Sequence, residues 1–185
     1  MARKLMTAAV ALLVCSTAFA AKPLRFDAVL EGFNAGGNPV QTNATGQARV
    51  EIIDDGTAVY FQIEVSNIRN LLMAHIHVSA DPNVPLPVPL TEPAGPIAYW
   101  FTGGPTPSTT VTETIHGNFA RGFIITDNDM DQGTGNTQAR TVAALIEAIK
   151  AGRASVVVHT DDLNPDTPTG RQGDSRGGEI RGTLQ

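Results

Sequence analysis

The stretch GQARVEII-DDG-TAVYFQIEVS, residues 46–66, decides the fold. Apolar and polar side chains alternate through Gly46–Ile53 and again through Thr57–Ser66, which is the period of a half-buried β-strand. The two runs flank Asp54–Gly56, and an Asp-Gly pair between alternating runs is a strong hairpin signal. The stretch therefore predicts two antiparallel strands with one buried face.

The rest of the chain follows the same pattern. Its 185 residues suit one domain, and 18 Gly and 12 Pro indicate many short strands joined by turns. A helical spacing of apolar residues occurs only at 138–151, before Gly152. We predict a mainly β protein, an antiparallel β-sandwich with one short helix near its C-terminal end. Besides the hairpin, the predicted strands are Leu24–Phe33, Leu71–Val78, a short one at Val88–Leu90, Ile97–Phe101, Val111–Ile125, Ala154–Thr160 and Glu179–Leu184.

The N-terminus has the pattern of a secretory signal. Arg3 and Lys4 precede an apolar run of roughly ten residues, too short to span a bilayer, and Ala18–Ala20 supplies a small-x-small cleavage site. We therefore predict a signal peptide at 1–20 and a β-sandwich domain at 21–185. The expected location is secreted or periplasmic, with no transmembrane segment after cleavage.

Cys15, the single cysteine, raises the alternative of a lipoprotein signal, although Val14 is larger than the residue that usually precedes a lipidated cysteine. Cleavage after residue 20 would leave a domain without thiols or disulfides. The formal net charge of the whole chain is −5, and the sequence has no basic stripe of the kind that phosphate backbones require. We therefore expect no nucleic-acid partner.

Three of the four histidines fall on predicted strands. His75 and His77 share one face of a strand, roughly 7 Å apart, and His159 lies opposite the core valines of another strand. If these strands are neighbours, the three imidazoles can bind one copper, zinc or nickel ion. The alternative is that they lie on an outer face and only form hydrogen bonds with loop backbone. His116, before a glycine, is the candidate for a fourth ligand.

Asp127, Asp129 and Asp131 have the alternating spacing of a calcium loop. However, Gln132 and Gln138 stand where an EF-hand needs a glycine and a bidentate glutamate. These aspartates are a weak calcium candidate, and an acidic turn before the helix is the preferred interpretation.

Glu179 and Arg181 are predicted to lie on one face of the last strand, near the histidine face. They could orient the imidazoles as a second layer around a metal. The preferred alternative is an exposed pair on the sheet surface, worth under about 1 kcal/mol.

Several of these segments together resemble the CHRD domain, first described in chordin and also found in many secreted bacterial proteins. The resemblance rests on AHIHV at 74–78, IKAG at 149–152, VVVHT at 156–160 and GGEIRG at 177–182. It implies an immunoglobulin-like β-sandwich or barrel in a secreted protein, and it transfers no enzymatic activity.

A second resemblance is to the copper/zinc superoxide dismutases. VVH at 157–159, DDL at 161–163 and GDSR at 173–176 are similar to a late segment of that family. The resemblance implies a superoxide-dismutase-like antiparallel β-sandwich. It also implies His75, His77 and His159 as copper ligands and Arg176 as the guide for an anionic substrate. The bridging histidine, the zinc ligands and the structural cysteines of that family are missing.

Two functions follow as expectations. The first is a secreted CHRD-domain module that binds an extracellular protein or associates with the envelope, with no enzymatic activity and no required cofactor. The second is a copper-binding protein, with superoxide-dismutase-like chemistry as its furthest extension, that uses His75, His77 and His159. The sequence identifies no specific partner.

Overall fold

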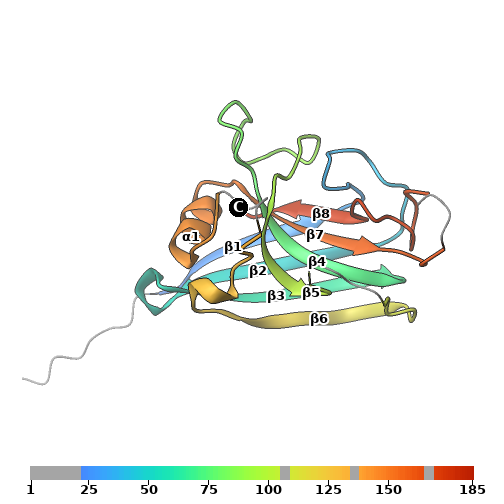
Figure 1. Ribbon diagram of the computed structural model, residues 1–185, viewed down its shortest axis with the longest axis horizontal. Helices are drawn as coiled ribbons and strands as arrows, with labels where there is room; N and C mark the ends of the chain where they lie inside the picture. The colour runs from blue at the N-terminus through green and yellow to red at the C-terminus, as the bar shows by residue number, and fades with distance from the viewer. Residues whose placement is uncertain (1–21, 105–108, 134–137, 165–168) are drawn as a thin grey trace, which may run out of the picture.

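The computed structural model describes residues 22–104, 109–133, 138–164 and 169–185. Within these ranges the chain forms two four-stranded antiparallel sheets that pack face to face (Figure 1). Sheet A has the strand order β1-β2-β3-β6, and sheet B has the order β5-β4-β7-β8. The elements are β1 Leu24–Leu30, β2 Thr45–Ile53, η1 Asp54–Gly56, β3 Ala58–Ile68, β4 Leu71–Val78, β5 Ile97–Thr102, β6 Ile115–Ile124, η2 Asp127–Asp129, α1 Val142–Lys150, β7 Ala154–Thr160 and β8 Ile180–Thr183.

The predicted hairpin is confirmed. β2 and β3 pair in register from Thr45 opposite Ser66 to Ile53 opposite Ala58. All three turn residues have positive φ, with 49° at Asp54, 53° at Asp55 and 91° at Gly56. Aspartate and glycine tolerate this left-handed backbone better than most residues. The local sequence therefore specifies the register of β2 and β3, the two central strands of sheet A.

The two ends of the chain join the sheets along one side. Asp27 and Gln185 exchange two backbone hydrogen bonds of 3.1 Å, and the amide of Arg181 donates to the carbonyl of Glu31 at 2.8 Å. A Cβ atom on Gly182 would lie 2.3 Å from the carbonyl oxygen of Val29, so only glycine allows β1 and β8 to approach this closely. Along this side the sandwich is closed by hydrogen bonds as well as by packing.

The core lies between the sheets. Along β4, Ala74, Ile76 and Val78 are buried against sheet A, as their alternation predicts. α1 covers one end of the sandwich and contributes Leu145 and Ile149, both fully buried (Figure 1). The remaining polar positions of β4 lie on the opposite face of sheet B.

Several predicted elements differ from those observed. β1 ends at Leu30 and not at Phe33, and β8 spans Ile180–Thr183 and not Glu179–Leu184. The helix begins at Val142, because Thr141 caps it by accepting the amide of Ala144 at 3.1 Å. β6 begins at Ile115, while Val111 forms an isolated bridge with Leu71. Val88 belongs to no strand. Its amide donates instead to the carbonyl of Gly152 at 2.9 Å, within the long loop of residues 79–96.

The predicted signal peptide, residues 1–20, lies outside the described residues and stays a prediction. In the part of the chain that the structure describes, no helix has the length and apolarity needed to cross a membrane.

Candidate metal centre

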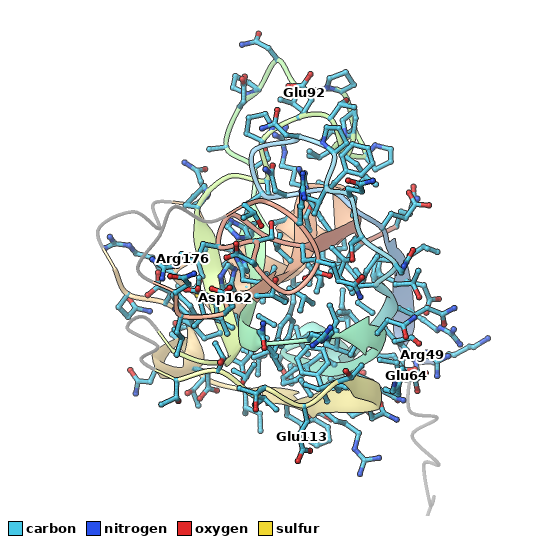
Figure 2. All side chains as sticks on the ribbon, turned by 90° about the vertical axis from the view of Figure 1, so that its right-hand side faces the viewer. Arg49, Glu64, Glu92, Glu113, Asp162 and Arg176 are labelled. Atoms are coloured by element: carbon cyan, nitrogen blue, oxygen red, sulfur yellow. The ribbon has the colours of Figure 1, made fainter. Side chains whose placement is uncertain are left out.

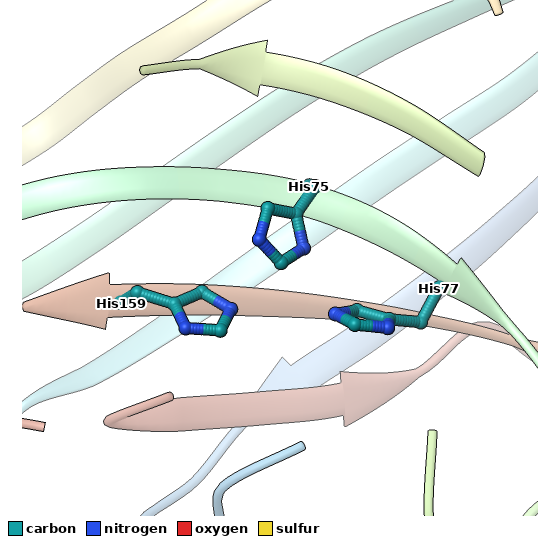
Figure 3. A group of neighbouring side chains, drawn as sticks. All are labelled: His75, His77 and His159. Atoms are coloured by element: carbon teal, nitrogen blue, oxygen red, sulfur yellow. The ribbon is translucent and has the colours of Figure 1, made fainter. Parts of the chain in front are cut away.

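The structure brings His75, His77 and His159 together. His75 and His77 come from β4 and His159 comes from its neighbour β7, where it lies opposite Met73 in the strand register. Each imidazole offers one nitrogen to a set whose members all lie within 4.8 Å of one another. Figure 3 shows the three rings gathered on one face of sheet B, which is the convergence that the sequence predicted if the two strands were neighbours.

The three rings are packed against one another. The ring centroid of His75 lies 4.3 Å from that of His159 and 4.6 Å from that of His77, while His77 and His159 are 6.3 Å apart. The ring of His75 therefore lies at the centre of the group.

Backbone carbonyls fix the tautomers of the two outer histidines. Nδ1 of His77 lies 2.6 Å from the carbonyl oxygen of Gly95, and Nδ1 of His159 lies 2.7 Å from that of Arg176. A carbonyl only accepts, so each Nδ1 carries the proton and each Nε2 keeps a lone pair. A histidine that binds a metal is commonly oriented in this way.

The lone pairs have no protein partner. Among the described residues no hydrogen bond reaches Nε2 of His77, Nε2 of His159 or either ring nitrogen of His75, although these atoms are buried. Leaving one buried polar atom unsatisfied costs about 1–3 kcal/mol. The group therefore holds several buried ring nitrogens without a hydrogen-bond partner close together.

Burial keeps these imidazoles neutral. It lowers the pKa of His75 far below its ordinary value, with a further lowering from His159 and His77. It also lowers the pKa of His77 and of His159 to about 4, against the opposing effect of their carbonyl partners. Neutral imidazole is the form that binds metals, so the site is ready for a ligand at neutral pH.

Two loops cover the histidine face. Residues 79–96 contact His77 through Gly95, and residues 169–178 contact His159 through Arg176. As a result His75, His77 and His159 are only 1%, 6% and 4% exposed. The sequence correctly placed them on the face opposite the core, where a loop and not solvent covers them.

Glu179 holds the second loop in place. Its carboxylate accepts hydrogen bonds from the hydroxyls of Thr42 at 2.5 Å and Thr160 at 2.6 Å and from the amide of Gly173 at 2.7 Å. These bonds tie the loop to β7 next to His159.

Arg181 holds the first loop. Its guanidinium donates to the carbonyl oxygens of Glu92 and Leu90, the latter at 3.3 Å, and to the hydroxyl of Ser155 at 3.3 Å. Burial lowers the pKa of Arg181 to about 10.

The preferred prediction of an exposed Glu179–Arg181 pair was therefore wrong, since both residues are fully buried. The two side chains bind different loops: Glu179 binds the loop of residues 169–178, and Arg181 binds the loop of residues 79–96. Burial of a charge requires such hydrogen-bond partners, and these partners come from loops that no local pattern places.

Arg176 lies beside the site, and its guanidinium is already paired with a carboxylate. Its guanidinium forms an ion pair with Asp161, whose side chain is 2% exposed while that of Arg176 is 50% exposed. Figure 2 places Arg176 and Asp162 on the same side of the molecule, opposite Arg49 and Glu64. A role as an anion guide, which the dismutase resemblance implies, would require this pair to open.

His116 does not join the group. It lies on β6 of sheet A, where Nδ1 is 3.2 Å from the hydroxyl of Ser66 and accepts the amide of Asn67 at 3.3 Å. The fold thus separates this histidine from the three on sheet B.

The three aspartates of the calcium candidate serve as local caps. The carboxylate of Asp129 accepts the amides of Ile125 and Thr126, and that of Asp127 accepts the amide of Val142 at the start of α1. Asp131 accepts the amide of Gly133. The arrangement is that of an acidic turn before a helix, with each carboxylate directed to backbone.

Two features near the site carried no clear signal in the sequence. Trp100 pairs with His75 across β4 and β5, and the two ring centroids lie 4.7 Å apart. A second acidic group, Asp161, Asp162 and Asp174, has carboxylate oxygens within 4.8 Å of one another. Strand pairing and loop closure create both, and neither is readable from spacing along the chain.

Comparison with known proteins gives one match. The family model of the CHRD domain matches residues 26–167, which include all three histidines of the site. The chain belongs to the CHRD domain family. Searches of curated proteins and of solved structures returned no match. The matched part of this CHRD domain ends before Arg176, Glu179 and Arg181, so the family model does not cover the two residues, Glu179 and Arg181, that hold the loops over the histidines.

Proposed function

We propose that this CHRD-domain protein is exported and binds one transition-metal ion through His75, His77 and His159. The observation that supports the proposal best is that three buried histidines, each with a ring nitrogen that finds no hydrogen-bond partner among the described residues, can offer ligand atoms within 4.8 Å of one another. A metal ion would bind one nitrogen of each ring at once, and imidazole suits copper, zinc and nickel.

The surrounding residues would give such a site its rigidity. Gly95 and Arg176 fix the tautomers of the outer histidines through their carbonyls, while Glu179 and Arg181 hold the loops that carry those carbonyls. Partners of this kind typically raise metal affinity by a factor of about 10–100. Copper bound here would supply one-electron redox chemistry, whereas zinc would not.

The proposal is tested by titrating the mature chain with copper, zinc and nickel and measuring stoichiometry and affinity. We expect one ion per chain, and strongly reduced affinity in His75→Ala and His159→Ala. His116→Ala is the matched control, because this histidine lies on the other sheet. The variant should bind metal with the affinity of the wild type. Absence of tight binding by the wild type, or equal binding by His159→Ala, would exclude the metal site.

A dismutase assay on the copper-loaded chain examines the redox extension separately. Arg176 is already paired with Asp161, so we expect weak activity that an Asp161→Asn substitution increases by freeing the guanidinium. Full activity in the wild type would show that the pair opens readily.

A further inference from the structure

We propose that the three-histidine site is selective for Cu(I) over divalent ions. The inference rests on the proposed metal binding and adds the charge of the ion that the site accepts. It is argued from the neutral donors, the buried cation beside them and the enclosure of the site.

The donors carry no negative charge. The group consists of three imidazoles, a donor type without negative charge, and the described residues add no carboxylate to it. Closed structural zinc sites are rich in thiolates, and a zinc ion held by three histidines keeps a fourth position open for water. Burying an ion without either form of compensation is costly. The full charge of the ion would therefore stay uncompensated at this site.

A buried cation lies beside the site. The guanidinium of Arg181 donates to the hydroxyl of Ser155, and Ser155 lies opposite His77 in the pairing of β4 with β7. The other hydrogen bonds of this guanidinium go to the carbonyls of Leu90 and Glu92. Among the described residues no carboxylate forms a salt bridge with it. A cation entering the site is therefore repelled by Arg181.

The neighbouring carboxylates are already committed. Asp161 forms an ion pair with Arg176, and Glu179 directs its oxygens to two threonine hydroxyls and the amide of Gly173. The electrostatic cost of burying an ion grows with the square of its charge, so a divalent ion faces about four times the cost of a monovalent one. Without a counter-charge, the monovalent ion is strongly favoured.

The burial of the three histidines beneath loops also favours Cu(I). Trp100 packs edge-on against His75, and two loops cover the other histidines, which leaves each ring at most 6% exposed. Zn(II) completes four or five positions, often with water, whereas Cu(I) is a monocation that forms stable complexes with two or three ligands. The buried group of three imidazoles fits the lower coordination number.

The test compares ions on the mature, full-length domain. Cu(I) is supplied without oxygen from a chromophoric chelator, Zn(II) and Cu(II) are titrated in parallel, and the fluorescence of Trp100, the single tryptophan, reports occupancy beside His75. We expect a Kd for Cu(I) lower than that for Zn(II) by at least about a hundredfold. Equal or tighter Zn(II) binding would overturn the selectivity and leave the metal site standing. Absence of binding by every ion would overturn both.

The role of Arg181 has its own pair of variants. Arg181→Gln removes the charge and keeps hydrogen-bond donors, so the preference for Cu(I) over Zn(II) should narrow by about tenfold or more. Arg181→Lys keeps the charge and should keep the preference. An unchanged ratio in a folded Arg181→Gln variant would contradict the charge argument. If circular dichroism shows that neither variant folds, the comparison of ions on the wild type decides.

Discussion

The outer faces of the two sheets both carry polar side chains, which are exposed on sheet A and buried on sheet B. On sheet A the side chains of Arg25, Asp27 and Arg49 are 49%, 53% and 43% exposed and form ion pairs at the solvent-facing surface. On sheet B the corresponding face holds three histidines and Arg181, all buried beneath loops. Both faces follow from the same alternation of strand residues. The difference shows that the period of a strand predicts where a side chain points, while the loops decide whether it meets water.

The largest expected effect is the loss of the Glu179 carboxylate. Glu179→Ala removes three hydrogen bonds from a fully buried anion, leaves Thr42, Thr160 and Gly173 without their acceptor, and should lower the free energy of unfolding by about 4 kcal/mol. Glu64→Gln on the exposed face of sheet A is the matched control and should stay within about 0.5 kcal/mol. Urea denaturation measures both, and a similar loss in the two variants would abolish the distinction between the faces.

Metal binding should give the next largest change. With free Cu(I) roughly a hundredfold above Kd, the folded state gains about 2.7 kcal/mol, which raises the melting temperature by about 5–10 °C. The gain should disappear in His159→Ala and persist in His116→Ala, since His116 lies on sheet A. Thermal scans with and without a chelator make the measurement. A chelator that leaves the loaded wild type unchanged would contradict this expectation.

Acid should destabilise the metal-free protein through the buried histidines. His77 and His159 have a pKa of about 4 in the fold against an ordinary 6.5, so between these values the unfolded chain binds more protons. Their contribution to stability is full above pH 6.5 and is lost as the pH falls towards 4. We expect a loss of about 2 kcal/mol between pH 7 and pH 5.5.

Urea denaturation at these pH values tests this expectation on the wild type and on His159→Phe. This variant should lose part of the pH dependence and keep the part that His75 and His77 contribute. An unchanged pH dependence in His159→Phe would contradict the contribution of His159.

The sequence predicted the sheet elements well because the deciding signals are local. The Asp54–Gly56 turn sets the register of β2 and β3, and the period of β4 places His75 and His77 on one face. The contact of these two histidines with His159 depended on β4 and β7 being neighbours in the sheet. That pairing is non-local, so no single segment of the sequence predicts it.

The burial of Glu179 and Arg181 could not be predicted in the same way. Their partners are Gly173, Leu90 and other loop atoms, whose positions depend on how Pro- and Gly-rich segments fold back over sheet B. The closure of β1 against β8 joins the two ends of the domain and is equally non-local. A role in binding an extracellular protein or the envelope stays a prediction, as does export by residues 1–20.

The most direct test of the central claim is the nitrogen NMR spectrum of the four histidines during Cu(I) titration. The account predicts that ring-nitrogen resonances of His75, His77 and His159 shift together and saturate at one ion per chain, while those of His116 stay unchanged. It also predicts that the metal-free His77 and His159 show protonated Nδ1 and free Nε2. A spectrum in which the three resonances do not move, or in which His116 moves with them, would contradict a metal site on the covered face of sheet B.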